Sequence, residues 1–459
     1  MSHSDNNYDA IVVGAGIGGL AVALLLAHSG KRVVILEKRL FPGGRLCSVQ
    51  RDGFTLDFGV HLVSRGEKGP LAEVLRRCDA DDEIEFTKVR PVQSTGGEIF
   101  KFPWDLKGRV PDSDFDAILR FVSDVKGMSD EETHSFDDMT LRDFLSRYTN
   151  DPFAHASISQ VGFIYCCIPE YRLSAGEFCR CLKWEAEAHA SGYPSGGCGA
   201  IVKAYTNALE KYKAEIKCGS PVDSIIVENG CAVGVVSGGE EYRAPLVVSN
   251  ADLRNTVNHL VGVEHFDKAY VDYVNALQYS YTSIIARFAL DTVISPDIKM
   301  LSNFPSMDAV EYAKTLMSGG VPDDLCSFIV VPSSFDSSVA PEGKQLVMMT
   351  TAVPDGINEE YCHALMDKLI ESAEVYFPGL RSHAEFVEKV FPSDANRAVG
   401  EAGCGIGVAQ DVGQAGTSRP SIKTPLEGLY IVGGEAGGSG VGIEMCCNSA
   451  MEFFDTYIS

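Results

Sequence analysis

The feature that most constrains the fold is a glycine-rich turn near the start of the chain. Apolar residues 10–13 predict a strand, and residues 20–29 predict a helix that Gly30 ends. A second strand is predicted at residues 33–36. Strand, helix and strand in this order predict a β-α-β unit, and therefore an α/β protein with a parallel sheet.

The turn after the first strand has the pattern Gly14-x-Gly16-x-x-Gly19. Gly14 permits a sharp turn, Gly16 lets the backbone approach a pyrophosphate, and Gly19 lets the helix pack on the strand. Glu37 follows the second strand, where a carboxylate accepts hydrogen bonds from ribose hydroxyls and repels a 2′-phosphate. The sequence therefore predicts a dinucleotide site that disfavours NADP.

Composition limits the other classes of function. The 459 residues predict two or three domains, and a net charge of −24 without a run of Lys or Arg excludes nucleic acid as the expected partner. The 14 cysteines show no zinc-ligand spacing, so no metal site is predicted. Residues 10–27 are apolar but glycine-rich and follow a leader without positive charge. We expect a cytoplasmic protein, for which peripheral membrane contact stays open.

Several different motifs are distributed from one end of the chain to the other. They are DAIVVGAGIGGLAVALLLAHSGKRVVILEK, the triplet Gly43-Gly44-Arg45, GFTLDFGVHL, YPSGGCGAIVKAY, VVSNAD, DSSVAPEGK and GLYIVGGEAGGSGVGIEMCCNSA. In this order they resemble the flavoprotein superfamily that includes phytoene desaturases, related carotenoid and isoprenoid desaturases or saturases, and the flavin amine oxidases. The stretch from about 69 to 189 is unmatched and α-rich.

The resemblance implies an extended FAD held by both ends of the chain. Gly44 and Arg45 are expected by the pyrophosphate and flavin edge, Val222 at the adenine, and Glu435 at the pyrophosphate or ribityl chain. His61, near the flavin ring, is the one candidate for catalysis. The full set of expected FAD contacts is Gly14, Gly16, Ile17, Gly18, Gly19, Glu37, Lys38, Gly43, Gly44, Arg45, Gly59, Val60, His61, Val222, Asn250, Gly434, Glu435, Gly442 and Ile443.

The resemblance also divides the chain. Residues 1–75, 190–252 and 418–459 are expected to form a discontinuous Rossmann-like FAD-binding domain. Residues 76–189 and 253–417 are expected to form a mixed α/β substrate-binding domain with an α-rich insertion. A helix that begins near residues 441–442 would direct its positive end at the flavin.

The expected activity is hydride transfer between a C–C bond of an apolar isoprenoid or polyene substrate and flavin N5. Two alternatives stay open. Gly434-Glu435 is the pattern of amine oxidases, although residues 436–449 lack the aromatic side chains that usually frame the flavin there. A flavin-bound protein without turnover also fits the glycines. The electron donor or acceptor and the oligomeric state are not predicted.

Overall fold

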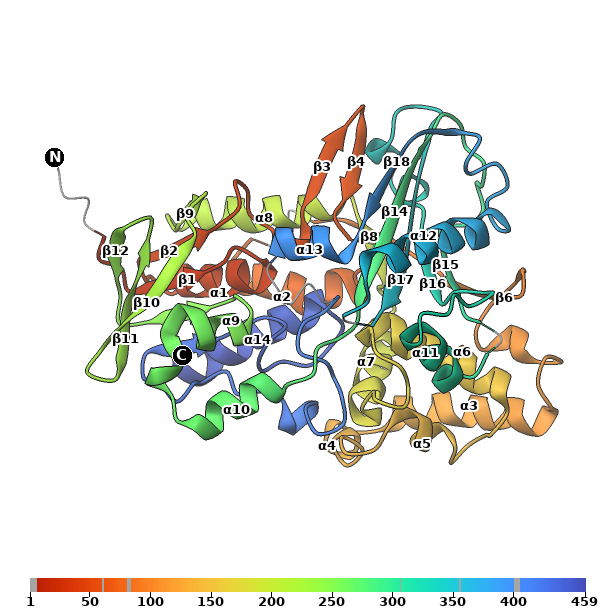
Figure 1. The fold of residues 1–459 in the computed structure, drawn as a ribbon, viewed down its shortest axis with the longest axis horizontal. Helices are drawn as coiled ribbons and strands as arrows, with labels where there is room; N and C mark the ends of the chain where they lie inside the picture. The colour runs from red at the N-terminus through yellow and green to blue at the C-terminus, as the bar shows by residue number, and fades with distance from the viewer. Residues whose placement is uncertain (1–5, 60–61, 81–83, 306, 355, 400–404) are drawn as a thin grey trace.

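The computed structural model describes residues 6–59, 62–80, 84–305, 307–354, 356–399 and 405–459 (Figure 1). The predicted β-α-β unit is confirmed as β1 (Ala10–Val13), α1 (Ile17–His28) and β2 (Val33–Glu37). The helix begins at Ile17 rather than at residue 20, so Gly18 and Gly19 lie inside its first turn. Glycine has a low helix propensity, but the first turn of α1 needs residues without a side chain, and this need outweighs the propensity.

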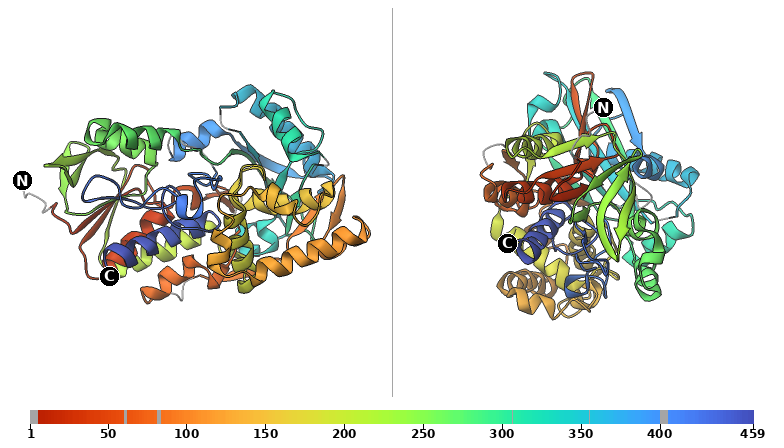
Figure 2. Two further views of the ribbon diagram at one scale, coloured as in Figure 1. Left: turned by 90° about the horizontal axis from the view of Figure 1, so that it is seen from below. Right: turned by 90° about the vertical axis from the view of Figure 1, so that its left-hand side faces the viewer.

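The first sheet is built from segments far apart in the sequence. Its order is β19-β13-β1-β2-β9, all parallel. Helix α1 packs against α8 and α14, and the three cover one face of this sheet (Figure 2). An antiparallel meander of β10, β11 and β12 packs on the other face. The bounds are β9 (Glu215–Cys218), β10 (Val222–Glu228), β11 (Cys231–Ser237), β12 (Glu240–Arg243), β13 (Val247–Ser249), β19 (Leu429–Ile431), α8 (Cys198–Lys211) and α14 (Ile443–Tyr457).

A second sheet has the order β18-β14-β17-β16-β15-β6-β7 and is antiparallel except between β6 and β15. Helices α11 and α12 contribute to the apolar core on this sheet. The bounds are β6 (Val92–Thr95), β7 (Glu98–Phe100), β14 (Thr282–Leu290), β15 (Met300–Asn303), β16 (Ser327–Val330), β17 (Gln345–Val353), β18 (Ala384–Val390), α11 (Ala309–Met317) and α12 (Glu359–Glu374). Strands β6 and β7 come from the stretch that was expected to be α-rich, and they are too short to show a period of two.

The α-rich stretch otherwise forms a helical layer with its own core. It contains α3 (Asp112–Gly127), α4 (Asp130–His134), α5 (Leu141–Leu145), α6 (Pro152–Cys166) and α7 (Ala175–Ala188). The remaining elements are β3 (Ser48–Arg51), β4 (Phe54–Asp57), β5 (Phe86–Lys88), β8 (Gly192–Pro194), α2 (Pro70–Arg77), α9 (Leu253–Asn255), α10 (Lys268–Ala276) and α13 (Pro392–Val399). The exact boundaries of the two domains stay a prediction.

A buried ionic network joins the helical layer to the C-terminal glycine loop. Arg180 on α7 donates to Asp137 at 2.7 Å and to Glu177 at 2.9 Å. The other carboxylate oxygen of Glu177 accepts from the backbone N–H of Gly440 at 2.8 Å. Because a buried charge is tolerated only when it is paired, this network fixes α7 against the loop that precedes α14.

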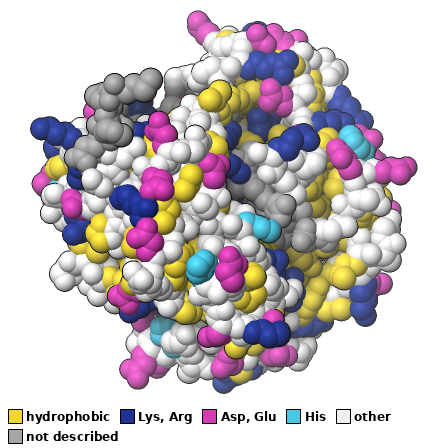
Figure 3. Space-filling view, turned by 60° about the vertical axis from the view of Figure 1, so that its left-hand side comes forward, with side chains coloured by type: hydrophobic (Ala, Val, Ile, Leu, Met, Phe, Trp, Pro, Cys, Tyr) yellow, Lys and Arg dark blue, Asp and Glu magenta, His cyan; other side chains and the backbone are white. Residues whose placement is uncertain are grey.

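Charged side chains of both signs are mixed on the surface, and most of the described thiols are buried. On the face shown in Figure 3, Lys and Arg side chains are interspersed with Asp and Glu. The cysteines that the structure describes are free thiols, most of them buried. Among the described residues, no helix combines the length and the apolar character needed to cross a membrane.

Candidate flavin site

A cavity of about 580 Å³ lies at the carboxyl ends of β1 and β2 and extends to the second sheet. One end is lined by the glycine turn, by β2 and by the start of β10. The other end is lined by α6 and by β14, β16 and β17. The carboxyl edge of an open parallel sheet is the usual place for a nucleotide, and the cavity volume lies within the ordinary range for ligand sites.

The glycine turn lies close to Asn250, the residue after β13. A Cβ on Gly16 would lie 2.7 Å from the Asn250 side-chain nitrogen, and one on Gly18 would lie 2.6 Å from its oxygen. A Cβ on Gly18 would also lie 2.8 Å from the Cα of Gly433 in the C-terminal glycine loop. The two glycine segments therefore meet at Asn250, and only glycine fits between them.

Glu37 lies in the cavity with both carboxylate oxygens held by backbone N–H groups. Oε2 accepts from Ala15 at 2.7 Å, and Oε1 accepts from Arg39 at 2.8 Å. Each oxygen keeps a free lone pair, because a carboxylate oxygen accepts two hydrogen bonds. The carboxylate is thus fixed in place and still able to accept from two adjacent hydroxyl groups.

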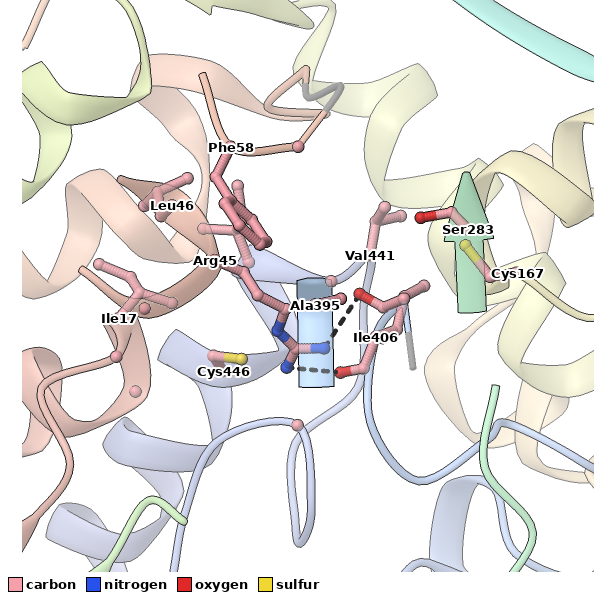
Figure 4. A pocket seen from close by; sticks show the side chains of 18 of the residues that line it. Ile17, Arg45, Leu46, Phe58, Cys167, Ser283, Ala395, Ile406, Val441 and Cys446 are labelled. Atoms are coloured by element: carbon pink, nitrogen blue, oxygen red, sulfur yellow. Dashed lines mark hydrogen bonds between the residues drawn. The ribbon is translucent and has the colours of Figure 1, made fainter. Parts of the chain in front are cut away.

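The Gly43-Gly44-Arg45 triplet lies directly beside the glycine turn and lines the same end of the cavity. Both glycines have left-handed backbone conformations, with φ values of 109° and 55°, which residues other than glycine rarely adopt. The Gly43 N–H donates to the Ala15 carbonyl at 2.8 Å. The Arg45 guanidinium reaches across the cavity and donates to the carbonyl oxygens of Gly405, at 3.1 Å, and Ile406, at 3.4 Å (Figure 4).

The C-terminal glycine loop is held by Arg419, which is buried. Its guanidinium donates to the carbonyl oxygens of Val408, Gly434 and Gly437. Gly442 caps the start of α14, lines the cavity, and has open space where a Cβ would point. The helix therefore presents its N-terminal backbone to the cavity, where unpaired N–H groups and the helix dipole favour negative charge.

Most of the residues predicted to contact FAD come together around this cavity. Those that line it are Gly14, Gly16, Ile17, Gly18, Glu37, Lys38, Gly43, Gly44, Arg45, Gly59, Val222, Asn250, Gly434, Glu435, Gly442 and Ile443. Gly19 does not line it. A Cβ there would lie 2.1 Å from the Gly14 carbonyl oxygen, so Gly19 allows helix and strand to pack but does not face the cavity. Val60 and His61 lie outside the described residues.

Glu435 is the most perturbed of these side chains. It is buried, and it accepts from the Leu253 N–H at 3.3 Å and from the Tyr279 hydroxyl at 3.1 Å. Burial, and then the nearby Asp252, raise the pKa of this carboxyl to about 7. Near neutral pH the side chain therefore changes between a neutral acid and an anion.

We expect FAD affinity to depend on pH through Glu435. Ionisation above the pKa of about 7 places a negative charge where the sequence predicts the cofactor's diphosphate. FAD should bind about threefold to tenfold more weakly at pH 8 than at pH 6, and Glu435→Gln should remove this difference. Quenching of FAD fluorescence on binding measures the dissociation constant at each of the two pH values. A wild-type affinity that is equal at the two pH values contradicts the predicted contact.

Glu185 on α7 is a cavity residue that the sequence analysis missed. One carboxylate oxygen accepts from the Tyr165 hydroxyl, and the other accepts from the Ser191 hydroxyl at 2.6 Å. Burial raises the pKa of Glu185 to about 7, with a smaller contribution from Glu444 at the start of α14. No sequence motif marks it, because it lies in the unmatched helical stretch and only the fold brings it to the cavity.

The chain is similar to known proteins along almost its whole length. It is 26% identical to prolycopene isomerase 2 of an Oncidium hybrid cultivar, over 93% of this chain and 80% of that protein. It is 27% identical to the zeta-carotene-forming phytoene desaturase of Myxococcus xanthus, over 94% and 90%. A solved oxidoreductase structure from Methanosarcina mazei superposes with a TM-score of 0.79 at 21% identity, covering 97% of this chain and all of that one.

The residues around the cavity fit the cofactor that these proteins imply. Backbone approach at three glycines, a fixed acceptor at Glu37 and a helix N-terminus at the opposite wall suit a long diphosphate dinucleotide. The model of the family "Flavin containing amine oxidoreductase" matches residues 17–452. The chain therefore belongs to the flavin-containing amine oxidoreductase family, and it is an FAD-dependent oxidoreductase.

Proposed function

We propose that this enzyme transfers a hydride between a C–C bond of an apolar isoprenoid or polyene chain and N5 of FAD. The observation that carries the proposal is the apolar far end of the cavity. There, α6 and the second sheet contribute the apolar side chains of Phe163, Ile164, Ile285, Met300 and Phe328. Between them lie uncharged polar side chains, which include Gln160, Ser283, Ser327, Thr350 and Thr351. The carotenoid-converting relatives support the same class of substrate.

The chain's own residues perform the steps around this transfer. FAD, when bound, supplies two-electron hydride chemistry. The apolar far wall binds and orients the chain and keeps water away from the reacting carbons. Forming a double bond removes a hydride from one carbon and a proton from its neighbour. We assign that proton to the Glu185 carboxylate, because it lines the cavity and the hydroxyls of Tyr165 and Ser191 hold it in place.

Anaerobic spectroscopy tests the substrate class. The purified holoenzyme is mixed with a panel of isoprenoid hydrocarbons in detergent, and flavin absorbance near 450 nm is followed (about the usual maximum for oxidised flavin). We expect the flavin absorbance to fall with at least one hydrocarbon whose C–C single bond can be oxidised, or the reduced enzyme to be reoxidised by at least one polyene. If no hydrocarbon changes the flavin in either direction, the proposal fails.

The same assay distinguishes the alternative substrate class. Polyamines and aromatic amines are added in air, and hydrogen peroxide is measured. Release of hydrogen peroxide from amines, together with no change of the flavin absorbance with any hydrocarbon, would assign the enzyme to C–N bond oxidation.

A further inference from the structure

A second cavity of about 410 Å³ lies beyond the far end of the flavin cavity. Its walls are α6, α11 and the segments that flank them, and Figure 1 shows these elements on the side of the molecule away from the glycine turn. Much of its surface is carbon, contributed by Phe153, Ala156, Pro169, Phe304 and Leu316. None of the motifs in the sequence analysis marks it.

The two cavities share three lining residues, Gln160, Phe163 and Cys326. Gln160 and Phe163 lie on the same face of α6, and Cys326 immediately precedes β16. Because each of the three faces both spaces, the wall between the cavities at this point is one side chain thick. We call these three residues the partition.

The partition is held by weak contacts. The Cys326 thiol donates to the Gln160 side-chain oxygen at 2.8 Å, and a thiol is a poor donor. The Gln160 side-chain nitrogen donates to the Ser327 carbonyl at 3.4 Å, near the limit for a hydrogen bond. The Phe163 ring meets Tyr281 edge to face at a centroid distance of 6.4 Å. Few strong contacts therefore hold these three side chains between the cavities.

The charged groups of the second cavity lie close to one another, and among the buried atoms of these described residues only the Nη1 nitrogen of Arg142 is left without a hydrogen bond. Glu170 is buried and lies 3.5 Å from Arg142 and 3.8 Å from His155, and it also accepts from the Ser159 hydroxyl. Arg142 pairs in addition with Asp308 at 2.7 Å. Because most of these groups pair with one another, the carbon wall is the main surface left for an apolar ligand to contact.

The flavin cavity must hold the whole cofactor, since its lining extends from the glycine turn to the second sheet. Only its far end is left for a substrate, which is little room for a long chain. We propose that the second cavity binds the distal part of a long apolar substrate whose reacting bond lies in the flavin cavity, and that the partition opens to admit it. This inference rests on the proposed function.

Filling the second cavity tests the proposal. Ala156 on α6 lines it, is only partly buried, and does not line the flavin cavity. We expect Ala156→Phe to lower kcat/KM for a forty-carbon isoprenoid hydrocarbon by about tenfold or more. For a twenty-carbon hydrocarbon with the same end structure, kcat/KM should stay within about twofold of the wild-type value. Ala269→Phe, at an exposed position on α10, is the matched control.

Two further variants make the result independent of one mutant's folding. Ala309→Phe fills the same cavity from α11 and should show the same length-selective loss. Phe163→Ala removes part of the partition and should raise the ratio of long-chain to short-chain kcat/KM. Equal loss for both lengths, or no loss with either filling variant, overturns the second cavity as a subsite but leaves the proposed function. Wild-type enzyme that converts no isoprenoid overturns both.

Discussion

Replacing Glu185 with glutamine is expected to lower kcat by about 100-fold or more, the usual loss when a positioned acid or base is removed. The substitution keeps the shape of the side chain but removes the ability to accept a proton. The Tyr165 and Ser191 hydroxyls can both stay in contact with it, because one of them can accept from the new amide nitrogen. Glu187→Gln is the matched control, because Glu187 is exposed on the same helix. FAD content and thermal unfolding should stay at wild-type values in both variants.

The pH profile shows in which direction the enzyme uses this group. With a pKa raised to about 7, the carboxyl is ionised above neutrality and neutral below it. If Glu185 takes a proton during desaturation, single-turnover flavin reduction should rise as pH increases through 7. If it gives a proton during saturation, flavin reoxidation should fall over the same range. Either dependence should be absent in Glu185→Gln. An unchanged rate and profile in that variant remove Glu185 from the chemistry.

Local sequence predicted many of the residues that line one end of the cavity, and their contact with FAD stays a prediction. The glycine turn, Glu37 and the triplet at Gly43 act through backbone geometry over a few neighbouring residues, and such geometry leaves a readable pattern. Their convergence with Asn250 and Gly442 was expected from the resemblance to flavoproteins, and the shared cavity agrees with it. Gly19 was assigned to the cofactor because the motif contains it, whereas its close approach to Gly14 serves helix packing.

The substrate end could not be predicted in the same way. Glu185 and the partition residue Cys326 reach the cavity through tertiary packing of α7 and β16, and a lone carboxylate or thiol in a helical or apolar stretch carries no pattern of its own. Strands β6 and β7 extend the second sheet from within a stretch that reads as helical, because three or four residues are too few for an alternating pattern. His61, the catalytic candidate from sequence, stays a prediction.

Replacing Gly18 with alanine should weaken FAD binding by about 100-fold, although it favours the helix. Alanine exceeds glycine in helix propensity by about 1 kcal/mol, so a purely local effect would stabilise α1. The new methyl group would instead lie 2.6 Å from the Asn250 side-chain oxygen and 2.8 Å from the Gly433 Cα. A side chain can turn away, but the Gly433 backbone cannot, so the two glycine segments must separate. Overpacking of this kind costs about 1 to 3 kcal/mol, of which the upper end is about 100-fold in affinity.

The matched control is Gly127→Ala near the end of α3, where a Cβ would meet nothing within 4 Å. The FAD affinity of each variant is measured by titrating the apoprotein with FAD. Binding is followed by flavin fluorescence and by the rise in melting temperature when FAD is bound. We expect Gly127→Ala to bind FAD as the wild type does and Gly18→Ala to be isolated largely colourless. Equal affinity in the two variants would mean that the segments at Gly18 and Gly433 do not have to stay in contact around the cofactor. The inference that both ends of the chain build one cofactor site would then be wrong, because the two glycine segments contact each other at Gly18 and Gly433.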